Sequence, residues 1–251
     1  MHSLIYGCCL RCCLGIVPAC LFVLSSMHSD TASADSLDTI DSLSQEQFVT
    51  FSENLSAATH YRSVAPPESL GILGFDVGIA VSSTDIDGSL FDLASDGDFS
   101  GSDLIVPRLH VQKGLPFGID IGASLSAVPD TDITVFGGEL RYAIVRGGIV
   151  TPAVGIRATY SQIQGHDDLD LNSAGLELGI SKGFLFVTPY AGVGIVHSSS
   201  DPQNIDGLSS ESYEQSKVLI GATLNFGFAL TLEADWTDDI RTYSAKAGIR
   251  F

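Results

Sequence analysis

The sequence predicts an all-β protein: an antiparallel up-and-down transmembrane β-barrel of about ten strands, with a short N-terminal helix. Three observations predict this fold class. From residue 70 onward, apolar and polar residues alternate with a period of two. The links between the alternating segments are short and long in turn, and the long ones are acidic. The polar face carries glycines and full charges in mid-strand, which suit a lumen better than a packed core.

The composition limits the kinds of partner and cofactor. The 251 residues include 12 basic and 30 acidic side chains, for a net charge of −18. This balance argues against binding to nucleic acid, which needs clusters of Lys and Arg. All five cysteines lie within the first 20 residues, so the remainder has neither a disulfide framework nor a cysteine metal site. We expect no cofactor and no bound metal.

Residues 1–34 are predicted to be a signal peptide. A basic residue precedes the apolar stretch 14–24, and a small-residue cleavage site follows at 32–34. A membrane anchor is one alternative, although the stretch is short and Pro18 interrupts it. Lipid attachment at Cys20 is another, although the nearby proline departs from the lipoprotein pattern. The N-terminus therefore predicts an exported protein.

Residues 35–68 are predicted to form a periplasmic segment with a short amphipathic helix from about 45 to 59. Apolar residues recur there at helical spacing, and Ser44 with Gln47 matches a capping box. Two consecutive prolines then end the segment. We expect the helix to lie at or in the periplasmic mouth of the barrel.

The barrel is predicted over 69–251. Its ten alternating segments lie near 70–83, 103–113, 117–128, 132–145, 150–164, 170–182, 186–198, 216–226, 228–237 and 241–251. An even strand number, with short turns at one end and longer loops at the other, is typical of a transmembrane β-barrel. A soluble sandwich or lipocalin-like barrel is the alternative, in which the apolar face would point inward. The charged, glycine-rich opposite face favours an apolar face turned to lipid.

Aromatic residues gather near both ends of the predicted strands. Those near the short turns are Phe117, Tyr142, Phe184, Phe186, Tyr190, Phe226, Phe228 and Phe251. Those nearer the other rim are Phe136, Tyr160, Trp236 and Tyr243. Two such girdles indicate a membrane-interface band.

The polar face of the predicted strands carries an equal number of acidic and basic residues. The acids are Asp76, Asp120, Glu139, Glu177, Glu233 and Asp235, and the bases are Arg108, Arg141, Arg157, Lys217, Lys246 and Arg250. Symmetric hairpins would place opposite charges across from each other in three places: Asp120 with Arg141, Arg157 with Glu177, and Glu233 with Lys246. A balanced lumen predicts internal ion pairs and a largely closed, narrow barrel, whereas a ring of one sign would predict a selective pore.

The last residues, SAKAGIRF, place Tyr243, Ala245, Ala247, Ile249 and Phe251 on one face of a strand. This pattern resembles the C-terminal strand of bacterial outer-membrane β-barrel proteins. The resemblance extends over about 70–251. In strand count the chain is similar to small ten-strand barrels, including an uncharacterised proteobacterial group. The resemblance implies that the barrel-assembly machinery recognises the last strand, with Tyr243, Ile249 and Phe251 as the assembly signal.

Three further motifs resemble parts of known sites. The loop at 96–101 resembles the opening half of an EF-hand, but Pro107 stands where a bidentate Glu is needed, so a solvated acidic loop is the simpler interpretation. His197 and Ser199 are two apart, similar to outer-membrane lipid A deacylases, but the Asn-Ala-Gly of that family is absent. His166-Asp167-Asp168 resembles the Asp/His pairs of ten-strand outer-membrane proteases, without a facing Asp pair. We therefore expect that the protein is not an enzyme.

The predicted function is that of an integral, porin-like outer-membrane barrel of a Gram-negative cell, with a structural or narrow transport or binding role. Its expected partners are outer-membrane lipid, lipopolysaccharide and the assembly machinery. Two alternatives stay open: a lipid-modifying hydrolase (esterase or deacylase) that uses His197 and Ser199, and a small-molecule channel gated by the N-terminal helix. The sequence specifies neither a ligand nor an oligomeric state.

Overall fold

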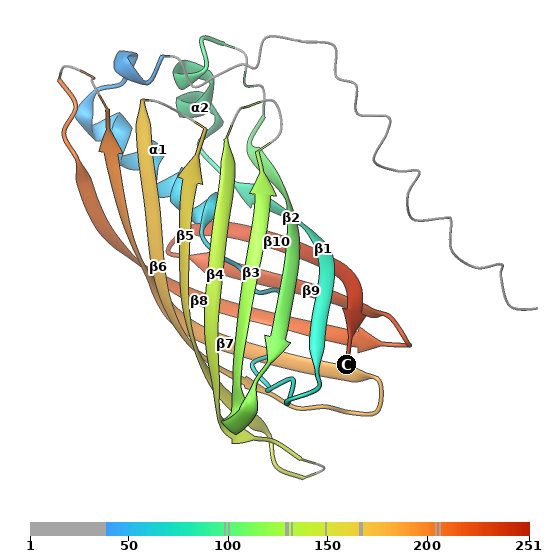
Figure 1. Ribbon diagram of the computed structural model, residues 1–251. Coiled ribbons are helices and arrows are strands. Elements are labelled where there is room, and N and C mark those ends of the chain that lie inside the picture. The colour runs from blue at the N-terminus through green and yellow to red at the C-terminus, as the bar shows by residue number, and fades with distance from the viewer. Residues whose placement is uncertain are drawn as a thin grey trace, which may run out of the picture. The chain divides into compact units, whose positions relative to one another are not determined.

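The computed structural model describes residues 39–251 apart from 98, 100, 129, 130, 132, 149, 166, 167, 204 and 206. Ten strands form one closed barrel, in which each strand pairs antiparallel with its neighbours in the chain and the last strand closes onto the first (Figure 1). The predicted fold class and the N-terminal helix are confirmed. The predicted signal peptide lies outside the described residues.

The elements follow the predicted segments closely. The helices are η1 (Ile40–Ser42), α1 (Gln45–Thr59), α2 (Gly88–Ala94) and η2 (Pro116–Gly118). The strands are β1 (Phe75–Asp85), β2 (Asp103–Gly114), β3 (Ile119–Ala127), β4 (Thr134–Arg146), β5 (Ala153–Gln164), β6 (Leu169–Ser181), β7 (Val187–Pro202), β8 (Glu211–Asn225), β9 (Ala229–Thr237) and β10 (Ile240–Arg250). Among the described residues, no helix is both long enough and apolar enough to span a membrane.

The strands turn their apolar side chains outward and their polar side chains inward. In β2 every second residue is buried, and the buried set includes Arg108, His110 and Gln112. The outward set is apolar all round the barrel, as in Ile79 at 63% exposure and Leu232 at 56%. This arrangement is the reverse of a soluble barrel and confirms the predicted orientation of the two faces. Tyr190 differs from its predicted place in a girdle, because it points inward and is buried.

The two ends of the barrel differ. We call the end with the β2–β3, β4–β5, β6–β7 and β8–β9 connections the short-turn end, and the opposite end, which carries α2 and the β7–β8 connection, the long-loop end. Strand β1 begins at the short-turn end, where Phe75 and Phe251 exchange two backbone hydrogen bonds of 2.8 and 3.0 Å. The outward-facing Tyr243, Ile249 and Phe251 therefore lie on the strand that closes the barrel.

Helix α1 begins at the predicted residue because both halves of the capping box form. The Ser44 hydroxyl accepts from the Gln47 backbone N–H, and the Gln47 side chain accepts from the Ser44 backbone N–H. We expected this helix at the mouth with the short turns. Instead it lies at the long-loop end beside α2, at the top of Figure 1. The reason is that the inward side chains of the wall are apolar at the long-loop end, where the helix can bury its own apolar face.

Candidate functional site

The chain itself fills the lumen. Residues 54–67 are all buried, and after α1 the chain continues through the barrel as an irregular segment before β1 starts at Phe75. We call residues 39–70, which comprise η1, α1 and the segment 60–70, the plug. The candidate functional site is the set of contacts between the plug and the lumen wall.

The part of the plug at the long-loop end packs as the core of a soluble protein does. Phe48, Phe51 and Leu55 on α1 are at most 1% exposed, and the ring of Phe51 lies 4.7 Å from that of Phe91 on α2. Inward-facing residues of the wall complete the same cluster: Leu104, Val106, Val135, Ile163, Leu169 and Leu171. Burial of these side chains stabilises the docked helix by about 1.5–3 kcal/mol each.

The other face of α1 meets the wall through small hydroxyl side chains. The hydroxyls of Ser52 and Ser200 are 2.9 Å apart, and Ser56 lies 2.5 Å from Ser198. Short side chains on both surfaces let the helix approach the strands closely. At the long-loop end, partial burial raises the pKa of Glu53, and the nearby carboxylate of Asp238 raises it further.

Arg62 ties the end of α1 to the wall. Its side chain is fully buried, and Nε donates to Asp235 Oδ2 at 2.9 Å while Nη2 donates to Thr242 Oγ1 at 2.8 Å. The same guanidinium donates to the carbonyls of Ala57 and Ala58, which lie in the last turn of α1. One buried cation therefore satisfies the free carbonyls of the helix end and pairs with a wall carboxylate.

Three wall arginines bind the backbone of the irregular segment. Arg108 donates to the carbonyl of His60 at 3.3 Å, Arg157 to that of Ala65 at 3.1 Å, and Arg141 to that of Pro66 at 2.9 Å. The segment belongs to no strand, so its buried carbonyls need donors from elsewhere. Charge-assisted bonds from guanidinium groups are among the stronger donors available. The wall therefore binds the backbone of the plug as well as its side chains.

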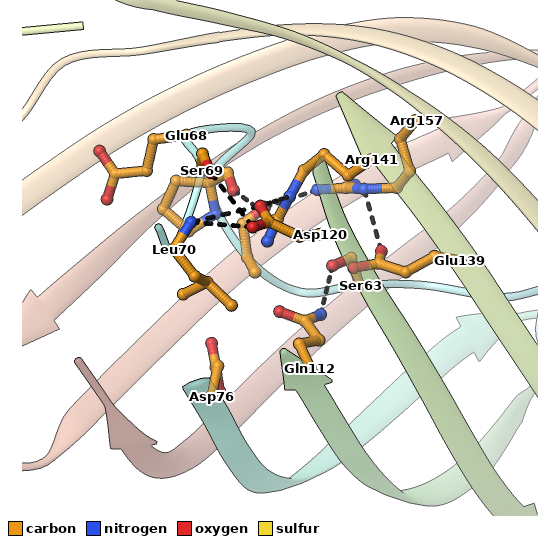
Figure 2. Close-up of polar contacts among 12 residues, drawn as sticks. Ser63, Glu68, Ser69, Leu70, Asp76, Gln112, Asp120, Glu139, Arg141 and Arg157 are labelled. Carbon is orange, nitrogen blue, oxygen red and sulfur yellow. Dashed lines mark hydrogen bonds and ion pairs between the residues drawn. The ribbon is translucent and has the colours of Figure 1, made fainter. Parts of the chain in front are cut away.

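Asp120 fixes the plug at the short-turn end. Its carboxylate accepts from the Leu70 backbone N–H at 3.2 Å, from the Ser69 hydroxyl at 3.1 Å and from Arg141 Nε at 3.0 Å (Figure 2). Further along the plug, Gln112 Nε2 donates to the Ser63 hydroxyl at 2.7 Å. The plug is thus held along its length, from α1 to Leu70.

Inward-facing glycines make room for the plug. A Cβ at Gly137 would lie 2.6 Å from Tyr61 Cδ2, and one at Gly155 would lie 2.5 Å from the Pro67 carbonyl oxygen. A Cβ at Gly122 would lie 3.0 Å from the Tyr61 hydroxyl oxygen, and one at Gly179 would lie 3.0 Å from Pro67 Cβ. The sequence indicates only a roomy lumen at these four glycines, whereas the structure brings the plug against the wall there.

The fit at Gly137 can be tested by adding one methyl group. Gly137→Ala is expected to destabilise the folded protein by about 1–3 kcal/mol, because the new Cβ overlaps the buried ring of Tyr61. Gly138→Ala is a matched control, since its Cβ would meet only the Gly122 carbonyl oxygen at 3.6 Å. Unfolding midpoints in urea measure both. The placement of the plug would be contradicted if the two changes shifted the midpoint equally. It would also be contradicted if Gly137→Ala lowered the free energy of unfolding as much in a Tyr61→Ala background as in the unsubstituted protein.

The predicted lumen residues all face inward, and each is buried except Arg250, which is half-buried. The structure brings together Asp120 with Arg141 at 3.0 Å and Arg157 with Glu177 at 2.7 Å, as the symmetric hairpins predict. Further ion pairs join Arg157 to Glu139, Lys217 to Glu177, Lys246 to Asp76, Arg250 to Asp76 and Arg250 to Glu68.

The predicted pair of Glu233 with Lys246 does not form. The β9–β10 turn pairs Thr237 with Ile240, and this register puts Glu233 opposite Ser244. Lys246 instead bonds to Asp76 across the closing seam at 3.0 Å, and Glu233 accepts from the Tyr190 hydroxyl at 2.6 Å. The hairpin is centred one residue earlier than expected, which shifts every partner by two.

The two candidate catalytic motifs gain no support. His197 and Ser199 lie on the outer face of β7, and within the described part of the chain no hydrogen bond joins them; Ser199 accepts from Ser212 at 3.3 Å. His166 and Asp167 lie outside the described residues, as do Asp98 and Ser100 of the EF-hand-like loop. The described residues contain no group of three or more His, Cys, Asp or Glu able to hold a metal ion.

No family model and no curated protein matches the chain. Among solved structures it is similar to Ail, the attachment invasion locus protein of Yersinia pestis, at 16% identity over 71% of this chain and 98% of Ail, with a TM-score of 0.31. It is also similar to the N-terminal β-barrel domain of Pseudomonas aeruginosa OprF (13% identity, 69% and 97% covered, TM-score 0.34). A third is the translocator domain of the autotransporter NalP from Neisseria meningitidis (9% identity, 88% and 99% covered, TM-score 0.33). These superpositions are loose.

Proposed function

We propose that the protein is an integral outer-membrane β-barrel with a closed lumen and a structural, anchoring role. The observation that carries this proposal is the plug, which occupies the lumen from Phe48 at the long-loop end to Leu70 at the short-turn end. A barrel filled in this way holds the folded helices η1, α1 and α2 at its long-loop end and does not act as an open diffusion pore. No cofactor is needed for this role.

The outer face supports insertion in a membrane. Apolar side chains cover it on every strand, with Ile220, Val111, Leu140 and Leu178 about half exposed. A soluble monomer rarely exposes an apolar patch of more than a few hundred Å². A closed sheet leaves no unpaired strand edge, and this is the requirement for strands in lipid. We therefore propose the outer membrane as its location, with lipid and lipopolysaccharide around the belt.

The last strand supports a role for the barrel-assembly machinery as a partner. Tyr243, Ile249 and Phe251 are each more than half exposed on the outer face, so they are available for recognition. Their strand also forms the seam with β1, and its docking completes the closed sheet.

A channel gated by α1 alone is less well supported. Below the helix, the segment 60–70 still occupies the lumen and is bonded to Arg108, Arg141, Arg157 and Asp120. Movement of the helix would leave these contacts in place. The hydrolase alternative has no support from the geometry of His197 and Ser199.

The full-length protein extracted from outer membranes tests this proposal. We expect its band to shift on a gel between unboiled and boiled samples, because a closed barrel resists detergent. In planar bilayers the same preparation is expected to show no large, stable conductance, because the plug fills the lumen. A soluble periplasmic protein without a band shift would refute the membrane assignment, and a stable open pore would refute the closed lumen.

A further inference from the structure

We propose that the barrel carries the start of its own plug to the cell exterior and displays it there. The protein would then serve as a surface-display scaffold for the segment that enters α1. This inference rests on the proposed insertion in the outer membrane, and it reverses the expectation that the N-terminal segment is periplasmic.

The start of the plug is built into the long-loop end. Thr39 donates its backbone N–H to the Ala94 carbonyl at 3.2 Å and its hydroxyl to the Leu93 carbonyl at 2.8 Å, both at the end of α2. Gln45 makes a reciprocal pair with the backbone of Ser209, in the β7–β8 connection, at 3.2 and 2.9 Å. Two separate long-loop connections therefore hold the entry to α1.

The other end of the plug lies at the opposite end of the barrel. Leu70 is bonded to Asp120, the second residue of β3, close to η2. Lys113 Nζ, at the short-turn end of β2, then donates to the carbonyls of Ile72 and Gly74 at 2.6 and 3.1 Å. The chain thus enters the lumen at the long-loop end and leaves it at the short-turn end. Because the surrounding ring of strands is closed, the chain passes through the barrel and does not merely lie against one side of a sheet.

The asymmetry of the two ends indicates which one faces outward. In outer-membrane barrels the short turns are periplasmic and the longer loops are extracellular. The long-loop end here carries the whole of α2 and the connection from Pro202 to Glu211. The residues just before α1 would then lie outside the cell. There Ile40 and Leu43 are buried at the long-loop end, whereas Asp41, Ser42 and Ser44 are exposed.

Single cysteines report the side on which each end lies. The chain's own cysteines are confined to the first 20 residues, so the body of the protein offers no competing thiol, and the unsubstituted protein measures the background. Ser42→Cys marks the start of the plug. Asp239→Cys in the β9–β10 turn marks the long-loop end, and Gly148→Cys, whose added side chain meets open space, marks the short-turn end. A membrane-impermeant maleimide is applied to intact and to permeabilised cells.

We expect intact cells to label Ser42→Cys and Asp239→Cys alike, and Gly148→Cys to lose its labelling unless the outer membrane is opened. If Asp239→Cys is labelled in intact cells but Ser42→Cys is not, the display inference is overturned while the proposed function stands. If Gly148→Cys is labelled in intact cells and Asp239→Cys is not, the orientation assumed for the membrane-inserted barrel is overturned as well. Each variant must show the heat-dependent band shift, and Asp41→Cys provides a second, independent mark at the start of the plug.

Discussion

Deletion of residues 35–66 is expected to convert a non-conducting protein into a stable open pore. The ring of strands should survive, because among the described residues each strand pairs only with its neighbours in the ring and none pairs with the plug. The deletion removes the helix together with the segment that Arg108, Arg141 and Arg157 bind. Beyond the apolar wall residues at the long-loop end, the emptied lumen is lined by charged and hydroxyl side chains, which admit water and ions. Single-channel recordings measure the change from no stable conductance to a persistent one.

A shorter deletion separates plug closure from helix gating. Removal of 35–56 takes most of α1 but leaves Arg62 and the segment that is bonded to Asp120. We expect this variant to conduct much less than the longer deletion, whereas a gate made by the helix alone predicts equal conductance. Both variants should keep the heat-dependent band shift. A correctly folded longer deletion that still fails to conduct would show that the barrel is closed by its own wall.

Substitution of Arg62 by Met is expected to produce the largest loss of stability from a single side chain of the plug. Both partners of the Arg62–Asp235 pair are fully buried, so the change leaves an uncompensated carboxylate inside the protein. Breaking a buried pair in this way costs about 3–5 kcal/mol. It also frees the carbonyls of Ala57 and Ala58 at the helix end. The free energy of unfolding in urea, measured in detergent, gives the size of the loss.

Two companion variants identify the cause. Arg241→Met removes an exposed arginine near the long-loop end and is expected to have little effect. The double variant Arg62→Met/Asp235→Leu should recover most of the lost stability, because apolar replacement of a whole buried pair is often neutral. If the double variant is as unstable as the single one, the loss comes from the helix end and not from the isolated carboxylate.

The course of the strands follows from local patterns. Each strand has one apolar outer side and one lumen-facing side, so its period of two is visible in the sequence without knowledge of its neighbours. The α1 helix is equally local, since Ser44 and Gln47 cap it through contacts three residues apart. The Asp120–Arg141 and Arg157–Glu177 pairs follow from symmetric turns. The β9–β10 register does not, because a turn shorter by two residues still agrees with the same alternation.

The path of the plug has no local signal beyond Ala58. Residues 60–70 have no strand or helix period, and their partners come from separate strands: Asp235 from β9, Arg108 from β2, Arg141 from β4 and Arg157 from β5. No local pattern in the sequence singles out Arg62. The inward glycines were the available hint, because a lumen wall with empty positions implies that something else fills the space.

The sequence by itself therefore determined the class of fold, the strand number, the start of α1 and the inward set of charges, because each depends on residues close together in the chain. Only the tertiary structure decided which end of the barrel holds α1, how the chain crosses the lumen and which charges the closing seam brings together. These features depend on contacts that exist only once β10 has paired with β1 and the ring has closed around the plug.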